Sequence, residues 1–531
     1  MADNKEAAGE VPVGAHSPVT PTEKDHITNT ASETHSNTPG APIARPAGWM
    51  YKGFKIGKTE LWYASPKMQL FMVAMVCFLC PGMYNSLTGM GGGGQLDTQV
   101  QDNANTALYS TFAVVGFFSG TFANRLGIKL TLSLGGLGYC IYAASYLSYS
   151  HTENHGFVIF AGALLGVCAG LLWTGQGAIM MSYPPEHSKG RYISWFWIIF
   201  NLGAVIGSLI PLAQNINKIS GPVTDGTYAA FIVLMFVGAI LALFLCDADR
   251  VQREDGSHVI LMKNPSWTSE IKGLWETMYL DPWIVLLFPM FFASNTFYTY
   301  QTNDMNAAHF NTRTRALNNL LYWLAQIFGA VIFGYALDFP KVRRSLRAKI
   351  DLIVLATLTF VIWGGGYAWQ EKQATRGVVE ATDANGDSTY TGLVDWTDGG
   401  QKYVAPMFLY MFYGFFDAAW QTSIYWFMGA LSNSSRKAAN LAGFYKGIQS
   451  AGAAIFWRLD GIKKPYNTIF GATWGLLAAA LVFAAPIIWT RIQDTVPLEE
   501  DLKFSDETAA DVAARIAVSV GGGKTTGTAE V

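Results

Sequence analysis

The sequence predicts an all-α integral membrane protein whose twelve transmembrane helices form two pseudo-symmetric six-helix bundles. Twelve mostly apolar stretches, each of about 20 residues and so long enough to cross a bilayer, lie between Met68 and Arg491. Because backbone amides cannot stay unpaired in hydrocarbon, these stretches are expected to be helical. Hydrophobic residues make up 51% of the chain and charged residues only 14%, a balance typical of membrane helices.

The predicted spans fall into two groups of six. They lie at residues 68–90, 105–125, 128–149, 157–182, 191–213, 228–246, 283–302, 316–337, 349–369, 404–431, 438–457 and 466–491. The loop between the groups is polar and of mixed charge, as a linker would be. We therefore expect a disordered tail at 1–48, an N-terminal bundle at 49–246, a linker at 247–282, a C-terminal bundle at 283–491 and a second tail at 492–531.

Basic residues predict the orientation. They are concentrated in the loops on one side of the predicted bundle, for example Arg125, Lys129, Arg343 and Arg344, whereas the opposite loops of the first half contain only Lys218. Basic loops face the cytoplasm in most membrane proteins. Both termini and the linker are therefore predicted to be cytoplasmic, although the opposite loops of the second half also carry basic residues.

Several function classes are excluded by what the chain lacks. The net charge of −2 gives no reason to expect a nucleic-acid partner. The chain has no nucleophile elbow, no metal-ligand spacing among its eight histidines and no phosphate-binding loop. The sequence therefore predicts a protein that is not an enzyme, has no metal or cofactor, and has the lipid bilayer as its constant partner.

Two similar segments occupy equivalent places in the two halves. Gly120, Asn124, Arg125, Gly127 and Lys129 follow the second span, and Gly334 and Asp338 follow the eighth. Both segments resemble the G-x-x-x-D-R-x-G-x-K loop of the major facilitator superfamily. The resemblance implies a cytoplasmic latch between the halves, but Asn124 stands where that loop has an acidic residue. The alternative is a tight basic turn that only fixes the topology.

A narrower resemblance covers essentially all twelve spans. Residues 80–95, 295–323 and 414–460 are similar to the Unc-ninety-three-like branch of that superfamily, particularly its fungal members. The resemblance implies the facilitator fold and two function classes. One is a secondary transporter of a small molecule or ion that works by alternating access of the two halves. The other is a non-transporting regulator or trafficking partner of a membrane protein such as a channel or receptor. A ligand-sized central cavity would favour the first, and a closed centre the second.

The run Gly91–Gly94 ends the first span. Four glycines remove helical preference and let backbone approach closely. The run is expected to be either a flexible loop that ends the helix or a hinge or ligand contact.

Asp417 and Lys446 are the ionisable residues that lie well inside the predicted spans. Burying either one alone costs several kcal/mol. At a rise of about 1.5 Å per residue, they lie at depths of roughly 21 and 12 Å, so their side chains can meet. Gln421, one turn from Asp417, is an alternative partner. The pair is either purely structural or linked to a substrate or proton.

Other polar side chains fall at membrane depth on spans that face the centre in the facilitator arrangement. Together with the ionisable pair, the predicted substrate-cavity residues are Asn85, Trp173, Gln176, Asn295, Tyr298, Gln301, Asp417, Gln421 and Lys446. Gln326 and Asn201 are expected to form hydrogen bonds between helices instead. The cavity is therefore predicted to be polar and aromatic on both sides but charged only on its C-terminal side.

Overall fold

The computed structural model describes residues 47–57, 59–116, 118–183, 189–247, 250–253, 267–373, 376, 393–431 and 435–494. The described residues all belong to one compact unit within residues 45–531. The predicted tails therefore lie almost entirely outside the described residues. Inside a described helix, the surroundings of Gly120 and the side chain of Asn124 also lie outside the description.

Six membrane-length segments precede the linker. A short hairpin of β1 (Phe54–Ile56) and β2 (Thr59–Leu61) comes first. The first span consists of α1 (Pro66–Cys77), a π-helical turn (Phe78–Gly82) and α2 (Met83–Gly89). The next five are α3 (Thr98–Val115), α4 (Ser119–Thr152), α5 (His155–Ser182), α6 (Lys189–Asn215) and α7 (Asp225–Leu243).

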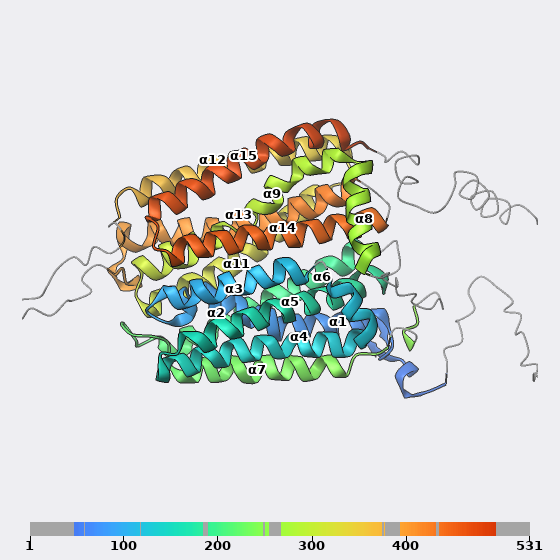
Figure 1. The fold of residues 1–531 in the computed structure, drawn as a ribbon, viewed down its shortest axis with the longest axis horizontal. Helices are drawn as coiled ribbons and strands as arrows, with labels where there is room; N and C mark the ends of the chain where they lie inside the picture. The colour runs from blue at the N-terminus through green and yellow to red at the C-terminus, as the bar shows by residue number, and fades with distance from the viewer. Residues whose placement is uncertain are drawn as a thin grey trace, which may run out of the picture. The chain divides into compact units, whose positions relative to one another are not determined.

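Six further segments follow α8 (Trp267–Leu280), which crosses the ends of the long helices in Figure 1. The first is broken into a 3₁₀ turn (Pro282–Leu287), α9 (Phe288–Ala293), α10 (Phe297–Thr299) and a π-helical stretch (Tyr300–Ala307). The others are α11 (Thr312–Leu337), α12 (Arg344–Gln370), α13 (Gly400–Leu431), α14 (Ser435–Gly461) and α15 (Tyr466–Arg491). The predicted twelve-helix membrane fold is confirmed.

Length and apolarity alone identify eight of these helices, in the described part of the chain, as able to cross a membrane. The other four segments are α3, the broken segment, α13 and α14, whose sequences contain more polar or aromatic residues. Polar side chains are costly in lipid, so such helices are expected to turn them toward the protein interior. These helices supply most of the polar contacts described below.

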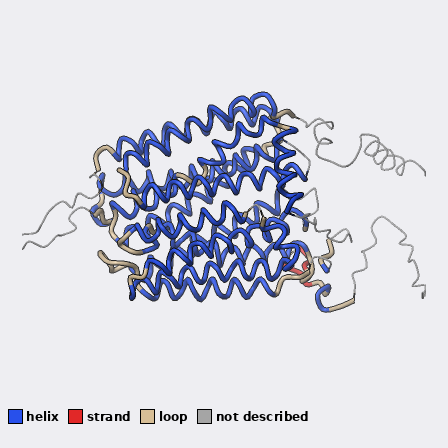
Figure 2. Tube along the Cα trace, viewed as in Figure 1, coloured by secondary structure: helices blue, strands red, loops and turns tan. Residues whose placement is uncertain are grey.

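The first and seventh segments are interrupted, whereas most of the other long helices are continuous coils in Figure 2. Pro81 lies within the π-helical turn of the first segment. Proline has no N–H to donate, so the regular hydrogen-bond ladder cannot continue through it. In the seventh segment, residues 294–296 are non-helical between α9 and α10. This break places Asn295 at the centre of the protein, where it takes part in the site below.

Buried apolar residues form two cores. One contains residues 62–251 of the first group of helices together with Ala316, and the other contains residues 284–492 together with Ala204 and Val205. Between the groups, α3 packs along α14 and α6 packs along α11. The two cores agree with two bundles, while the residue boundaries predicted for the bundles and the linker stay predictions.

The segment Gly120–Lys129 forms part of α4, where the sequence predicts a loop. The helix begins at Ser119 and turns at Gly127, whose φ of 75° and ψ of 160° are not helical. Glycine has no Cβ to oppose a positive φ, so it can form this corner without strain. The turn therefore depends on a single residue, with helix on both sides of it.

Candidate functional site: a central polar cavity

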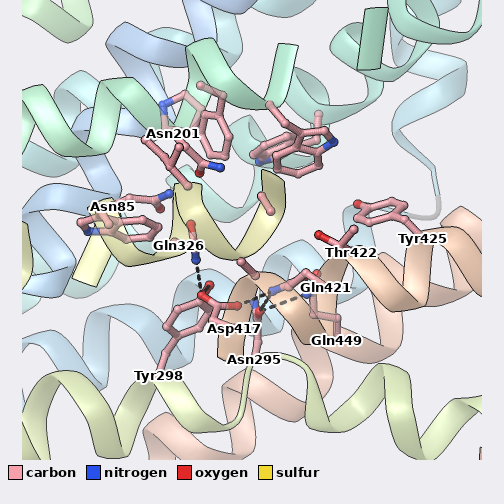
Figure 3. A pocket seen from close by; sticks show the side chains of 18 of the residues that line it. Asn85, Asn201, Asn295, Tyr298, Gln326, Asp417, Gln421, Thr422, Tyr425 and Gln449 are labelled. Atoms are coloured by element: carbon pink, nitrogen blue, oxygen red, sulfur yellow. Dashed lines mark hydrogen bonds between the residues drawn. The ribbon is translucent and has the colours of Figure 1, made fainter. Parts of the chain in front are cut away.

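A cavity of about 1190 Å³ lies between the two groups of helices. The first group contributes Asn85, Trp173 and Asn201 to its wall, and the second group contributes Gln326 and Asp417. In Figure 3, Asn85 and Asn201 lie across from the polar residues of the second group. Ligand sites of many proteins are mostly apolar cavities of this kind with a few convergent polar groups.

Asp417 on α13 is fully buried and accepts hydrogen bonds from three helical segments. Its Oδ2 accepts from Tyr298 Oη at 2.6 Å and from Tyr322 Oη at 3.0 Å. Gln326 Nε2 donates to the same oxygen, as Figure 3 shows, and Gln421 Nε2 donates to Oδ1 at 3.3 Å. These donors replace the water that a carboxylate loses on burial.

The break in the seventh segment brings its polar groups against α13 and α14. Asn295 Oδ1 accepts from Gln449 Nε2 at 3.0 Å and from Gln421 Nε2 at 3.3 Å. Gln449 Nε2 also lies 3.2 Å from Gln421 Oε1, an oxygen that accepts from Tyr445 Oη as well. The amides of these residues are therefore engaged with one another along one wall of the cavity.

Lys446 on α14 lies in this wall and is half-buried. Its Nζ donates to Gln449 Oε1 at 3.1 Å. The ammonium also lies over three aromatic rings, at 5.4 Å from the centre of Trp173, 5.8 Å from Tyr425 and 5.2 Å from Tyr445. Rings at these distances attract a cation through their π faces.

The predicted contact between Lys446 and Asp417 is wrong. The carboxylate is saturated by the hydroxyl and amide donors above, and the ammonium binds Gln449 and the rings. Gln421, the predicted alternative partner of Lys446, bonds Asp417 instead. Depth along the helix axes allowed a contact, but the rotation of the helices about those axes decides which side chains meet.

Seven of the nine predicted cavity residues line the cavity: Asn85, Trp173, Asn295, Tyr298, Asp417, Gln421 and Lys446. Gln176 and Gln301 do not belong to its wall. Gln176 is buried. It lies three residues after Trp173, so the two side chains point about 60° apart around the helix axis. Gln301 lies in the π-helical stretch, where its Oε1 is 2.9 Å from the Tyr322 hydroxyl, whose single proton it shares with Asp417. Asn201 and Gln326, expected only to link helices, also line the cavity.

Both halves meet closely at the end of the helices that carries Gly91–Gly94, which we call the glycine end. All four glycines are buried and have positive φ. A Cβ added to Gly91 would overlap the carbonyl oxygen of Thr302 in the second half. The run therefore ends the first span as predicted, but it is a tightly packed turn against the other half rather than a flexible loop. It does not line the cavity, and a hinge role stays a prediction.

Arg315 on α11 holds this turn. Although the sequence places it in a loop, it is buried, and its Nε donates to the carbonyl of Met90 at 2.7 Å. Its Nη2 donates to the carbonyls of Gly91 and, at 3.3 Å, Gln95. A guanidinium presents several N–H donors in a fixed plane, which suits several carbonyls at once.

Two asparagines of the second half also donate to backbone carbonyls of the first half. Asn306 Nδ2 donates to the carbonyl of Gly89 at 3.1 Å, and Asn319 Nδ2 donates to the carbonyl of Ser86 at 2.7 Å. Both asparagines belong to the second half, and both acceptors belong to the backbone of the first. The second half thus binds the end of the first span through its main chain.

An acidic cluster lies nearby, formed by Asp102, Asp304 and Asp460 with Asn303 and Arg376. Asn303 Nδ2 donates to Asp102 of the first half at 2.7 Å and to Asp460 of the second at 3.1 Å. Arg376 Nη2 lies 2.5 Å from Asp304 Oδ1 and also pairs with Asp460. All three carboxylates are buried. The apolar pattern does not indicate these residues, because they lie at the ends of the apolar stretches.

The predicted latch residues lie at the opposite end, which we call the latch end. Lys129 Nζ pairs with Asp247 Oδ2 at 2.9 Å, and Asp338 Oδ1 accepts from Trp426 Nε1 at 3.3 Å. Neither contact joins the two halves. Arg125 is exposed, and the side chain of Asn124 lies outside the described residues.

The cavity differs at the two ends of the helices. Its wall runs from Thr88 and Gly89, which are buried at the glycine end, to Gly334, Tyr335 and Asp338 at the latch end. Tyr335 is 79% exposed and Asp338 is exposed, so the cavity reaches the protein surface there. The cavity wall therefore ends in buried residues at the glycine end and reaches the protein surface at the latch end.

This arrangement, two groups of six membrane helices around a polar cavity that reaches one end, defines a transporter-type membrane protein. The profile of the Major Facilitator Superfamily matches residues 68–457. A UNC93-like protein of Schizosaccharomyces pombe is 49% identical over 462 residues, which cover 87% of this chain and 90% of the relative. UNC93-like protein 1 of Arabidopsis thaliana is 41% identical over 433 residues, which cover 81% of this chain and 92% of that protein.

The chain belongs to the major facilitator superfamily and, within it, to the UNC93-like proteins. Among solved structures, the xylose transporter XylE from E. coli, in a partially occluded inward open conformation, is similar with a TM-score of 0.54. The likeness covers 79% of this chain and 98% of XylE at 12% identity. At that identity, the likeness concerns the fold.

Proposed function

We propose that this protein is a secondary transporter that moves a small solute through the central cavity by alternating access. The observation that carries the proposal is the cavity itself, which is large enough for a small solute and contains polar groups from both halves. Substrate sites of transporters of this type lie between repeated halves near the middle of the membrane.

The difference between the two ends supports the proposal. At the glycine end, Arg315, Asn306 and Asn319 bind across the halves. At the latch end, the contacts of Lys129 and Asp338 do not join the two halves. Rocking of the halves would break the first set and bring the latch segments together, which exposes the cavity on the other side.

The side of the membrane to which the cavity opens follows from the charge of the loops. If the basic loops face the cytoplasm, the latch end is cytoplasmic and both termini lie on that side. The cavity then opens to the cytoplasm in this conformation.

The competing function is that of a non-transporting regulator or trafficking partner of another membrane protein. That function needs no solute site and would be favoured by a closed centre. The cavity of about 1190 Å³ therefore favours transport.

Uptake by the purified full chain in sealed liposomes would test the proposal. We expect at least one solute from a metabolite panel to accumulate, or to exchange against itself, faster than in protein-free liposomes. A matched pair of variants provides the control. Thr422 lines the cavity, so Thr422→Trp should narrow it, displace a bound solute and lower uptake at least about tenfold.

Thr357 on α12 is exposed outside the cavity, so Thr357→Trp should transport like the unchanged protein. Equal uptake by the two tryptophan variants would place transport elsewhere. Absence of uptake and exchange across the panel, by protein that melts cooperatively, would overturn the proposal in favour of the regulator.

A further inference from the structure

We infer that Lys446 binds the carboxylate of a small organic anion, so that the solute class of this cavity is monocarboxylates with an apolar body. That the anion is transported rests on the proposed function. The binding of the anion rests on the surroundings of Lys446 alone.

The ammonium of Lys446 has more N–H donors than the hydrogen bond it makes requires. A lysine ammonium carries several donors, and the hydrogen bond recorded for this one goes to Gln449 Oε1 at 3.1 Å. That acceptor is a neutral amide. Among the described residues, no carboxylate lies within ion-pair distance of the Lys446 ammonium.

Neither carboxylate in the cavity wall can serve as the counter-charge. Asp417 is fully buried and already accepts from Tyr298, Tyr322, Gln326 and Gln421. Asp338 lies at the mouth of the cavity, where it accepts from Trp426. A half-buried cation without a counter-ion is costly, and an anionic ligand would remove that cost.

The two glutamine amides beside Lys446 are occupied. Gln449 Nε2 donates to Asn295 Oδ1 at 3.0 Å and to Ser294 Oγ at 3.2 Å. Gln421 Nε2 donates to Asp417 and to the carbonyl of Ser294 at 3.3 Å. A neutral solute would therefore find these two amides engaged, whereas a carboxylate would find a charged donor in Lys446. Charge-assisted hydrogen bonds are the stronger kind.

The rings around Lys446 indicate the rest of the ligand. Trp173 comes from α5 of the first half, and Tyr425 and Tyr445 come from α13 and α14 of the second. Trp197 continues this wall, with its ring centre 5.9 Å from that of Tyr425. An apolar or aromatic body attached to the carboxylate would lie against rings of both halves.

Ligand-dependent melting of the purified full chain in detergent tests the inference. The probes are three carboxylates, each with its neutral amide: benzoate with benzamide, indole-3-acetate with indole-3-acetamide, and hexanoate with hexanamide. At least one carboxylate should raise the melting temperature more than its amide. Lys446→Gln should weaken the apparent affinity for that carboxylate by about tenfold to a hundredfold and leave the affinity for the amide within about threefold.

Lys446→Arg keeps the charge and should keep the preference for the carboxylate. Lys402→Gln removes an exposed lysine outside the cavity and serves as the matched control for loss of one charge. Equal responses to acid and amide in all three pairs would overturn the inference. So would a preference for the carboxylate that survives in Lys446→Gln.

Uptake in liposomes separates this inference from the proposed function. Binding of a carboxylate that depends on Lys446, without uptake of any solute, would refute transport and support the anion site. Uptake of neutral solutes, without any effect of Lys446→Gln on carboxylate binding, would support transport and refute the anion site.

Discussion

Lys446 and Asp417 face the same cavity from α14 and α13 without forming an ion pair. Asp417 is enclosed by four donors, whereas Lys446 is half-buried and donates to one amide. The two charges therefore have different surroundings. One is part of the packed interior, and the other is available to a ligand.

Substitutions at these two residues should accordingly differ in their effect on stability. Asp417→Asn introduces an amide N–H₂ where several donors converge, so we expect it to cost about 1–3 kcal/mol. Lys446→Gln should cost less than about 1 kcal/mol, because its removal leaves one neutral acceptor, Gln449, without a partner. Melting in detergent without ligand measures both. A loss from Lys446→Gln as large as that from Asp417→Asn would show that the lysine is structural.

The acidic cluster at the glycine end depends on Arg376. Removal of this guanidinium by Arg376→Gln leaves three buried carboxylates without their cation, so we expect a loss of about 3 kcal/mol. Asp304→Asn in the same chain removes one of those charges and should restore a large part of the loss. A double-mutant cycle by melting in detergent measures this coupling. Additive losses would show that the two residues act independently.

Gly91→Ala tests the packing of the glycine end, and Gly127→Ala is its matched control. Their backbones are similar, with φ 71° and ψ 144° at Gly91 and φ 75° and ψ 160° at Gly127. A Cβ at Gly127 meets nothing within 4 Å, whereas one at Gly91 overlaps Thr302. Gly91→Ala should therefore lower stability by about 1–3 kcal/mol more than Gly127→Ala. Equal losses would mean that backbone strain alone matters at Gly91.

A pH dependence is expected from Asp395, in the loop before α13. Burial raises its pKa, but hydrogen bonds lower it by more. Arg313 Nε donates to its Oδ2 at 2.7 Å, and the Thr397 amide donates to its Oδ1 at 2.9 Å. The net result is a pKa well below the ordinary value of about 3.9 for Asp.

Because the native pKa is lowered, the stabilisation from ionised Asp395 is present above about pH 4–5 and is lost as the pH falls through the native value. Asp395→Asn lacks this titration. The difference in melting temperature between the unchanged chain and Asp395→Asn should therefore shrink between about pH 6 and pH 3. A difference that stays constant or widens on acidification would contradict the assignment.

Apolar stretches predicted the membrane helices well, because lipid-facing surface requires them. They predicted helix ends less well. α3 begins at Thr98, seven residues before the predicted span at 105–125, and α11 begins at Thr312 rather than at 316. These extra turns are polar, and they carry Asp102 and Arg315. A search for apolar residues alone therefore assigns such buried polar turns to loops.

The cavity could be predicted in part for a related reason. Residues at membrane depth were readily recognised, and Asn85, Asn295 and Asp417 do line the cavity. Their partners could not be predicted, because a partner depends on helix rotation and on local breaks. The π-helical stretch that turns Gln301 toward Tyr322, and the break that brings Asn295 to Gln449, have no simple pattern in the sequence.

The contacts of Arg315, Asn306 and Asn319 have a genetic consequence. These side chains donate hydrogen bonds to backbone carbonyl groups of the first half. Every amino acid has a backbone carbonyl, so most substitutions in the first half leave these acceptors in place. A screen for mutants with a weakened closure should therefore recover side-chain losses mainly in the second half. In the first half, the recovered changes should be gains of bulk at glycine, together with losses of Asp102, whose carboxylate binds Asn303 of the second half. The glycine end is thus one interface with two different mutational spectra.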